Sequence, residues 1–303
     1  MSGLPKNSPH ALAGIALLVT AVACFAVLDT TTKAVTLSVP VLMALWVRYA
    51  FQAIATTLAV LPKRGWSLPP TAHPKFQTLR GVLLLCTSLF AFFSLKYMPV
   101  GEFTAIVMIT PLVMTLLASF TLGERVSGLR WLLVAGGFTG TLIIIRPGGG
   151  DGGFNWAMLL PLGLVVSNAW FQILTSRLAR TEHAMTTHFY TGWVGTLLAS
   201  LALPFVWTSL DSWMLWAALA LMGCAGTVGH FFMILAYGKA PVSTLTPFLY
   251  AQIGFAMLGG WLVFSHVPDA WSLIGIVTIA VCGAGGAWLT LRETRLALEP
   301  VEA

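Results

Sequence analysis

Long apolar runs recur along the whole chain and are separated by short polar segments. A helix needs about 20 apolar residues to cross a hydrocarbon core roughly 30 Å thick, and these runs have about that length. A transmembrane β-strand would instead alternate in polarity over about ten residues. The pattern therefore predicts an all-α integral membrane protein with ten transmembrane helices. Their expected ranges are 11–32, 41–61, 79–96, 102–122, 129–145, 156–178, 185–207, 212–237, 242–264 and 270–291.

The composition is typical of a protein that lies in lipid. Of the 303 residues, 57% are hydrophobic and only 9% are charged, so a water-soluble fold could not hide the apolar surface. The lipid bilayer is therefore a predicted partner. The net charge of +6 could suggest nucleic acid, but the basic residues do not cluster on a soluble module or interleave with exposed aromatic residues. We expect no nucleic-acid partner.

The basic residues predict how the chain is oriented. Cytoplasmic loops of membrane proteins carry an excess of Lys and Arg. One side of the predicted bundle receives only Lys33, Lys96 and Arg146, whereas the loops and termini on the other side receive most of the rest. Both termini are therefore predicted to be cytoplasmic, in the inner membrane of a bacterial cell. The basic residues assigned to that side are Lys6, Lys63, Arg64, Lys75, Arg80, Arg125, Arg130, Arg177, Arg180, Lys239, Arg292 and Arg295.

The motifs of common catalytic sites are missing from the sequence. It has no His-Glu-x-x-His pair, no serine in a Gly-x-Ser-x-Gly turn and no phosphate-binding glycine loop. Its four cysteines fall within predicted spans and lack the spacing of metal ligands. We therefore predict no enzyme activity, no catalytic residue, no metal and no cofactor. These cysteines are Cys24, Cys86, Cys224 and Cys282.

The two halves of the chain echo one another on either side of a glycine-rich joint at residues 146–153. At an offset of about 140 residues, aromatic and threonine positions coincide, and a short polar segment coincides at a slightly longer offset. The sequence therefore predicts a repeat with units 1–147 and 148–303. The matched positions are Tyr97 with Tyr237, Thr104 with Thr244, Trp131 with Trp271, and Thr31-Thr32-Lys33 with Thr175-Ser176-Arg177.

Five helices per unit is an odd number, so the two copies must enter the membrane from opposite faces. The loop charges agree with this inversion. Loops of the first half carry Lys and Arg, whereas the equivalent loops of the second half carry Asp211, His266 and Asp269 and no Lys or Arg. The predicted architecture is two inverted five-helix repeats.

Several short motifs carry a resemblance to a known family. The first half contains Thr110-Pro111, then Gly123-Glu124-Arg125, then Gly136-Gly137, and the second half contains Ala240-Pro241 followed by Phe264-Ser265-His266. In this order and spacing the chain resembles EamA-type members of the drug/metabolite transporter superfamily over nearly its whole length. Many members have Phe-Gly-Glu where this chain has Phe264-Ser265-His266. The resemblance implies export of small metabolites, amino acids among them.

Arg48 is the most informative candidate residue. It lies about seven residues inside its span, roughly 10 Å from the helix end, where exposure to lipid would cost about 2.5 kcal/mol or more. It should therefore face a cavity, where it could hold a substrate carboxylate, or form a structural pair with a carbonyl or with Asp29. His188, which matches Arg48 in the repeat, and His230 are candidates either for substrate or proton contacts or for packed neutral rings.

Other polar and aromatic side chains within the spans complete the candidate substrate site. Buried amides require partners, whereas many of the aromatic residues could instead belong to the interface belts of the membrane. Asp29 and Glu102 are predicted near span ends on the outer side, with Asp29 paired to Lys33, and no carboxylate is predicted deep in a span. These other candidates are Trp46, Tyr49, Gln52, Phe93, Tyr97, Asn168, Trp170, Gln172, Phe248, Tyr250 and Gln252.

The predicted function is transport of a small-molecule substrate by alternating access through a central cavity between the repeats. Aromatic or other apolar amino acids fit a site with aromatic side chains and one arginine. The absence of deep carboxylates favours passive or weakly coupled transport. Alternatives are a different metabolite or drug class, a membrane enzyme without transport activity, or an assembly subunit. We expect a monomer or a weak homodimer, for which Gly136 and Gly140 offer a close-packing face.

The orientation can be tested by cysteine labelling in intact cells. Cysteines introduced at residues 63–75 should be shielded from impermeant thiol reagents because that basic loop is predicted to be cytoplasmic. Cysteines introduced at residues 149–153 should react. Labelling of the 63–75 loop from outside would contradict the predicted orientation.

Overall fold

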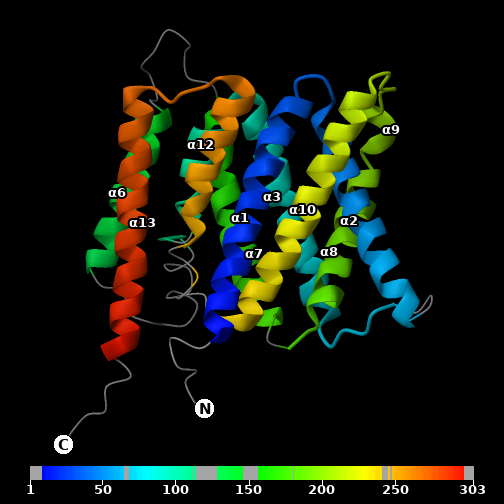
Figure 1. Cartoon of the computed structure of the whole chain (residues 1–303), viewed down its shortest axis with the longest axis horizontal. Helices are drawn as coiled ribbons and strands as arrows, with labels where there is room; N and C mark the ends of the chain where they lie inside the picture. The colour runs from blue at the N-terminus through cyan, green and yellow to red at the C-terminus, as the bar shows by residue number, and fades with distance from the viewer. Residues whose placement is uncertain are drawn as a thin grey trace, which may run out of the picture.

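The protein is a bundle of helices (Figure 1). The computed structural model describes residues 9–64, 68–110, 112–113, 128–145, 156–179, 181–240, 245 and 248–296. In these ranges the helices are α1 (Pro9–Val35), α2 (Val41–Arg64), α3 (Pro74–Tyr97), α4 (Val100–Val107), α6 (Gly128–Ile145), the 3-10 turn η1 (Trp156–Leu159), α7 (Leu160–Leu178), α8 (Ala184–Ser200), α9 (Leu203–Val206), α10 (Trp213–Lys239), α12 (Ala251–Phe264) and α13 (Ala270–Leu296).

Every predicted span contains a helix. Four of the described helices, α1, α2, α3 and α10, are long and apolar enough to cross a membrane, and shorter apolar helices lie at 131–144, 251–264 and 270–286. The prediction of an all-helical chain with membrane-length apolar segments is confirmed for the described residues. The second half of the predicted 102–122 span and most of the first residues of the 242–264 span lie outside them. The total of ten spans stays a prediction.

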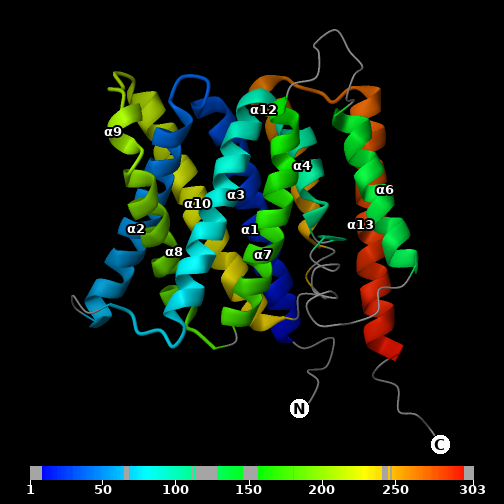
Figure 2. The same ribbon diagram turned by 180° about the vertical axis from the view of Figure 1, so that it is seen from behind.

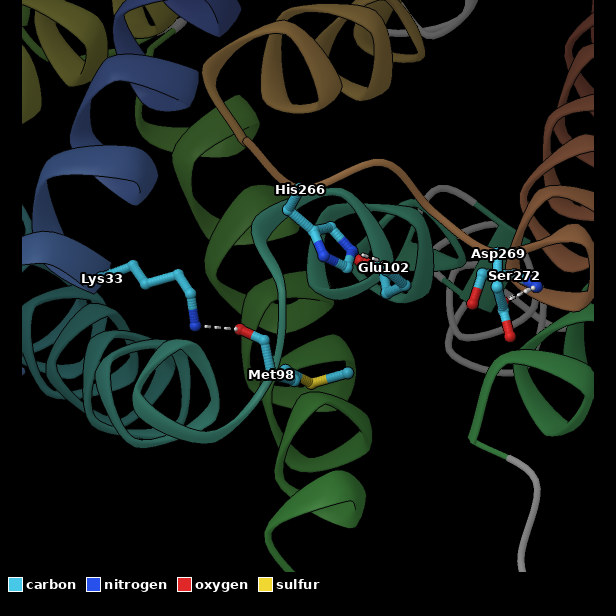
Figure 3. Close-up of polar contacts among 6 residues, drawn as sticks. All are labelled: Lys33, Met98, Glu102, His266, Asp269 and Ser272. Atoms are coloured by element: carbon cyan, nitrogen blue, oxygen red, sulfur yellow. Dashed lines mark hydrogen bonds and ion pairs between the residues drawn. The ribbon is translucent and has the colours of Figure 1, made fainter. Parts of the chain in front are cut away.

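Local sequence explains where several helices begin and end. α3 begins at Pro74, whose fixed φ and missing N–H suit the first turn of a helix. α13 follows Asp269, whose Oδ1 accepts a hydrogen bond from the Ser272 N–H at 2.8 Å (Figure 3). α12 ends at Phe264 because the next residue, Ser265, has a left-handed φ of 52° that stops helix propagation.

The helix contacts come in matched pairs. α1 packs on α10 as α7 packs on α3, α1 packs on α12 as α7 packs on α4, and α2 packs on α10 as α8 packs on α3. Three further pairs, α2 with α8, α4 with α12 and α6 with α13, join corresponding spans of the two halves directly. Exchanging the first five predicted spans for the last five therefore maps this contact pattern onto itself.

The arrangement of the helix ends agrees in both views of the bundle. α6 and α13 stand together at one edge, and α2 lies at the opposite edge (Figures 1 and 2). The first residues of α1 and the last residues of α13 lie at the same end of the bundle, at the bottom of both figures. We call this the inner end and the opposite end, where α1 and α3 finish, the outer end.

Small residues bring α2 and α8 close together. A Cβ at Gly192 would lie 3.0 Å from the backbone nitrogen of Ala53, and a Cβ at Gly195 would overlap the ring of Tyr49. Tyr49 is fully buried at this contact. Glycine at both positions lets the two helix backbones approach closely, which is how helices in membranes gain packing contacts.

The close contact of α2 and α8 predicts that Gly195→Ala is destabilising. The added methyl group must displace the ring of Tyr49, an overpacking that costs about 1–3 kcal/mol. Gly254→Ala in α12 is the matched control, because no atom lies within 4 Å of its added Cβ and alanine favours a helix. The midpoint of thermal unfolding in detergent should fall for Gly195→Ala alone. Equal midpoints for the two variants would contradict the packing described.

Candidate functional site

A cavity lies in the middle of the bundle, between helices of both halves. It has about 780 Å³ of space free of protein atoms and is lined from α1, α2, α3, α4, α7, α10 and α12. Aromatic rings form much of its wall, from Phe25, Phe92, Phe103 and Phe171. Its polar lining residues are Asp29, Arg48, Thr87, Ser88, Thr110, Asn168, Gln172, His230 and Gln252.

Arg48 lines this cavity from α2, and only 2% of it is exposed. Its Nη1 donates to Ser88 Oγ at 3.1 Å, and its guanidinium lies 4.6 Å from the centre of the Tyr49 ring. Tyr49 Oη lies 3.0 Å from the same Ser88 oxygen. Gly226 of α10 leaves room for the arginine, since a Cβ there would lie 3.0 Å from Nε. Arg48 thus faces a cavity rather than lipid.

Asp29 corrects the prediction that no carboxylate lies deep in a span. It is 8% exposed and lines the cavity from α1, which continues to Val35, beyond its predicted end. Its Oδ2 accepts a hydrogen bond from Gln252 Nε2 at 3.3 Å. Within the described chain Asp29 and Arg48 form no direct ion pair. The predicted passive transport rested on the absence of such a carboxylate, and Asp29 removes that basis.

Lys33 does not form the expected pair with Asp29. Its Nζ instead donates to the carbonyl oxygen of Met98 at 3.0 Å, at the end of α3 (Figure 3). It also donates to the carbonyl oxygen of Leu95 at 3.2 Å. The carboxylate of Asp29 therefore accepts a hydrogen bond from Gln252 and lines the cavity without an ion pair to Lys33.

His230 and Gln172 contribute to the cavity wall from α10 and α7. The His230 ring lies 4.8 Å from the centre of the Phe25 ring and 6.0 Å from that of Phe171. Gln172 Oε1 accepts a short hydrogen bond, 2.6 Å, from Tyr237 Oη. With Arg48, Asn168 and Gln252, these two bring five of the predicted site residues together at one cavity.

Three further candidates lie behind this wall. Tyr49 is buried against Ser88, and Gln52 joins α2 to α8 through His188. Gln52 Nε2 lies 3.2 Å from both His188 Nδ1 and the His188 carbonyl oxygen. His188 lines a separate space of about 470 Å³ beside Phe231. These residues support the neighbourhood of Arg48 without lining its cavity.

The remaining candidates lie elsewhere in the bundle. Trp46 donates to Ser200 Oγ at 2.8 Å, and Tyr250 packs against Gly283 of α13. The others either pack at the edge of the core or are substantially exposed. None of them lines the cavity, and their predicted substrate contacts stay untested. These others are Phe93, Tyr97, Trp170 and Phe248.

Arg80 is predicted from the sequence to lie on the cytoplasmic side, at the start of the 79–96 span, and this prediction misses its burial. α3 begins at Pro74, five residues before that span, so Arg80 lies deeper in the helix and is 1% exposed. Its Nε donates to Thr175 Oγ1 at 2.8 Å, and its Nη1 donates to Thr191 Oγ1. Its guanidinium lies 4.6 Å from the centre of the Phe171 ring. Arg80 therefore ties α3 to α7 and α8 below the cavity.

The described residues contain no group of three or more His, Cys, Asp or Glu side chains that could hold a metal ion. The four cysteines within them are free thiols. The described lining of the cavity is one of charges, amides and aromatic rings, which can hold a solute.

The comparisons with known proteins agree with this geometry. Residues 12–146 match the EamA-like transporter family. Over 284 residues the chain is 30% identical to a riboflavin transporter of Rhizobium johnstonii, a match that covers 92% of each protein. The chain belongs to the EamA-like transporter family. Its predicted resemblance to the drug/metabolite transporter superfamily is confirmed, and it is a multi-pass membrane transporter with bacterial relatives.

Other relatives of this EamA-like chain are named for different substrates. An S-adenosylmethionine uptake transporter of Rickettsia conorii is 25% identical over 76% of this chain and 78% of the relative. A pseudopaline exporter of Pseudomonas aeruginosa is 26% identical over 88% and 93%. A solved crystal structure with 19% identity matches with a TM-score of 0.67 over 93% of this chain and 98% of that chain, so the two share a fold.

One departure from the EamA-type motif has a structural explanation. His266 Nε2 lies 3.0 Å from Oε1 of Glu102, in the first turn of α4 (Figure 3). A glutamate at position 266 would place two carboxylates together, whereas histidine can hydrogen-bond to one. The contact joins α4 to the segment after α12 at the outer end.

Proposed function

We propose that this protein exports small zwitterionic aromatic metabolites, amino acids first among them, from the bacterial cytoplasm across the inner membrane. The observation that carries the proposal is a buried cation and a buried carboxylate, Arg48 and Asp29, on one cavity with aromatic walls. A substrate with a carboxylate, an ammonium group and a ring satisfies all three features.

Both charged side chains retain hydrogen-bonding capacity for such a substrate. A guanidinium has five N–H donors, and within the described residues Arg48 donates one hydrogen bond, to Ser88. An ionised carboxylate offers about four acceptor sites, and from the described residues Asp29 receives one hydrogen bond, from Gln252. Because buried charges need partners in a bundle surrounded by hydrocarbon, these remaining positions favour a ligand with complementary charges.

The proposed architecture is two inverted five-helix repeats, residues 1–147 and 148–303, with both termini in the cytoplasm. The matched helix contacts support the repeat, and the shared end of α1 and α13 supports an even number of crossings. The loop charges support the orientation. The cavity then lies between the repeats near the midplane, where alternating access requires it, with Asp29 and Arg48 from one half and His230 and Gln252 from the other.

A second candidate is a neutral heteroaromatic solute such as riboflavin. The relative from Rhizobium johnstonii bears that name, and the amides of Asn168, Gln172 and Gln252 could pair with ring nitrogen and carbonyl groups. Arg48 and Asp29 separate the two candidates, since a neutral ring gains no charge–charge attraction from either side chain. Relatives named for uptake and for export both exist, so the direction is a part of the proposal.

Counterflow in proteoliposomes tests the proposal. Arg48→Lys keeps the charge but loses the planar fork, so transport of a labelled aromatic amino acid should weaken by about 1–3 kcal/mol, or about 5- to 150-fold. The decarboxylated amine should be a poor substrate that the substitution hardly changes. Asp29→Asn should weaken transport of the amino acid by a similar factor. Arg292→Lys, on the exposed end of α13, is the matched control and should transport at the native rate.

Two results would overturn the proposal. In one, Arg48→Lys inserts normally and transports acid and amine alike at native rates, which would make Arg48 a structural residue. In the other, riboflavin exchanges while amino acids do not, which would establish the second candidate.

A further inference from the structure

Lys33 caps a helix at the outer end of the bundle. Its ammonium reaches from α1 to the Met98 carbonyl oxygen, at the end of α3 (Figure 3), and to the Leu95 carbonyl oxygen. Carbonyls at a helix C-terminus lack partners within the helix and carry partial negative charge, so a cation is favourable there. Pro99 follows, and because proline has no N–H it cannot bond the Leu95 carbonyl as an ordinary residue would.

The position of this cap suits a gate. Lys33 is one helical turn beyond Asp29, and Leu95 is about one turn beyond Phe92, and both Asp29 and Phe92 line the cavity. The ammonium also lies 5.7 Å from the centre of the Phe264 ring, at the end of α12. Lys33 thus holds α1, α3 and α12 together above the site, beside the contact between Glu102 and His266.

The second half contains the same parts at the inner end. The segment Thr175-Ser176-Arg177 at the end of α7 matches Thr31-Thr32-Lys33 at the end of α1. α10 ends like α3: Ala240 is an extended cap residue (φ −143°, ψ 150°) followed by Pro241, as Met98 (φ −134°, ψ 157°) is followed by Pro99.

This match identifies the carbonyl groups at the end of α10 that Arg177 would cap, and shows whether the cap is formed. Aligned on the extended cap residue and the proline after it, two positions away from the Tyr97–Tyr237 match, Tyr237 and Ala240 correspond to Leu95 and Met98. α7 packs on α10 as α1 packs on α3. Arg177 is nevertheless exposed and forms no hydrogen bond with any other part of the chain that the structure describes. The cap is made at the outer end and unmade at the inner end.

We propose that Lys33 and Arg177 are alternating helix caps that gate the two ends of the transport path. Lys33 caps α3 when the outer end is closed, and Arg177 caps α10 through the Tyr237 and Ala240 carbonyls when the inner end closes. The hydrogen bonds that break at one end are offset by those that form at the other, which keeps the two states close in free energy, as alternating access requires. The inference rests on the proposed inverted repeat and not on the proposed substrate.

Accessibility of one cavity residue to a membrane-impermeant maleimide tests the gate without any substrate. The probe is Ala91→Cys, which lines the cavity from α3, in protein whose native cysteines Cys24, Cys86, Cys224 and Cys282 are alanine. Labelling rates are measured from outside in spheroplasts and from inside in inverted vesicles. With Lys33 capping α3, the inside rate should exceed the outside rate.

Lys33→Gln should raise the labelling rate from outside about tenfold and lower the labelling rate from inside. The variant loses the charge-assisted hydrogen bonds to the α3 carbonyls, which exist only in the state that is closed at the outer end. Adding Arg177→Gln to that variant should return the outside rate toward native, since it removes the opposing cap. Lys33→Arg should label like the native protein because a guanidinium can donate to the same carbonyls. Lys96→Gln is the matched control, a neighbouring lysine that lies 5.7 Å from the Tyr97 ring and should change neither rate.

The inference is overturned if Lys33→Gln labels at native rates from both sides in protein of native amount and thermal stability. It is also overturned if adding Arg177→Gln leaves the outside rate raised. Should Lys33→Gln fail to insert, Arg177→Gln alone decides: the gate requires a further fall in the outside rate, and an unchanged rate refutes it. A failure of the proposed substrate would leave all of these rates unaffected.

Discussion

Charged side chains inside this bundle must find their partners within the protein, because hydrocarbon supplies none. Arg80 meets this constraint with hydroxyl and carbonyl oxygens of α7 and α8, and so connects helices. Arg48 and Asp29 each meet it with one described hydrogen bond and line the cavity. Arg80 is therefore a structural residue that connects helices, whereas Arg48 and Asp29 have further positions that a solute in the cavity could contact.

The same constraint explains the outer end of the molecule. The last carbonyls of α3 cannot be completed by the helix, because Pro99 follows, and they are met by the ammonium of Lys33. Since the two halves pack through matched pairs of helices, each contact of this kind implies a counterpart at the other end. In the proposed gate, a cap made at one end and unmade at the other marks one of the two states of alternating access.

Much of the fold could be predicted from the sequence, because apolar length fixes where helices can cross a bilayer. The depth of Arg48 likewise predicted that its side chain faces a cavity or a structural partner, and it lines a cavity. The depth of Asp29 and Arg80 could not be predicted, since it depends on helix ends that shift by a few residues and on which neighbours stand alongside. Aromatic residues carry no such signal at all: Phe171 on the cavity and Trp170, exposed one position earlier, look alike in an apolar run.

The central claim is that the cavity recognises both charges of a zwitterion. Equilibrium binding to the native protein in lipid nanodiscs tests it with an aromatic amino acid, its N-acetyl derivative and its carboxamide. Each derivative removes one charge and leaves the ring. We predict that the amino acid binds at least about tenfold more tightly than either derivative, because each loses a charge-assisted contact with Asp29 or Arg48. Equal affinities for all three compounds would contradict the account.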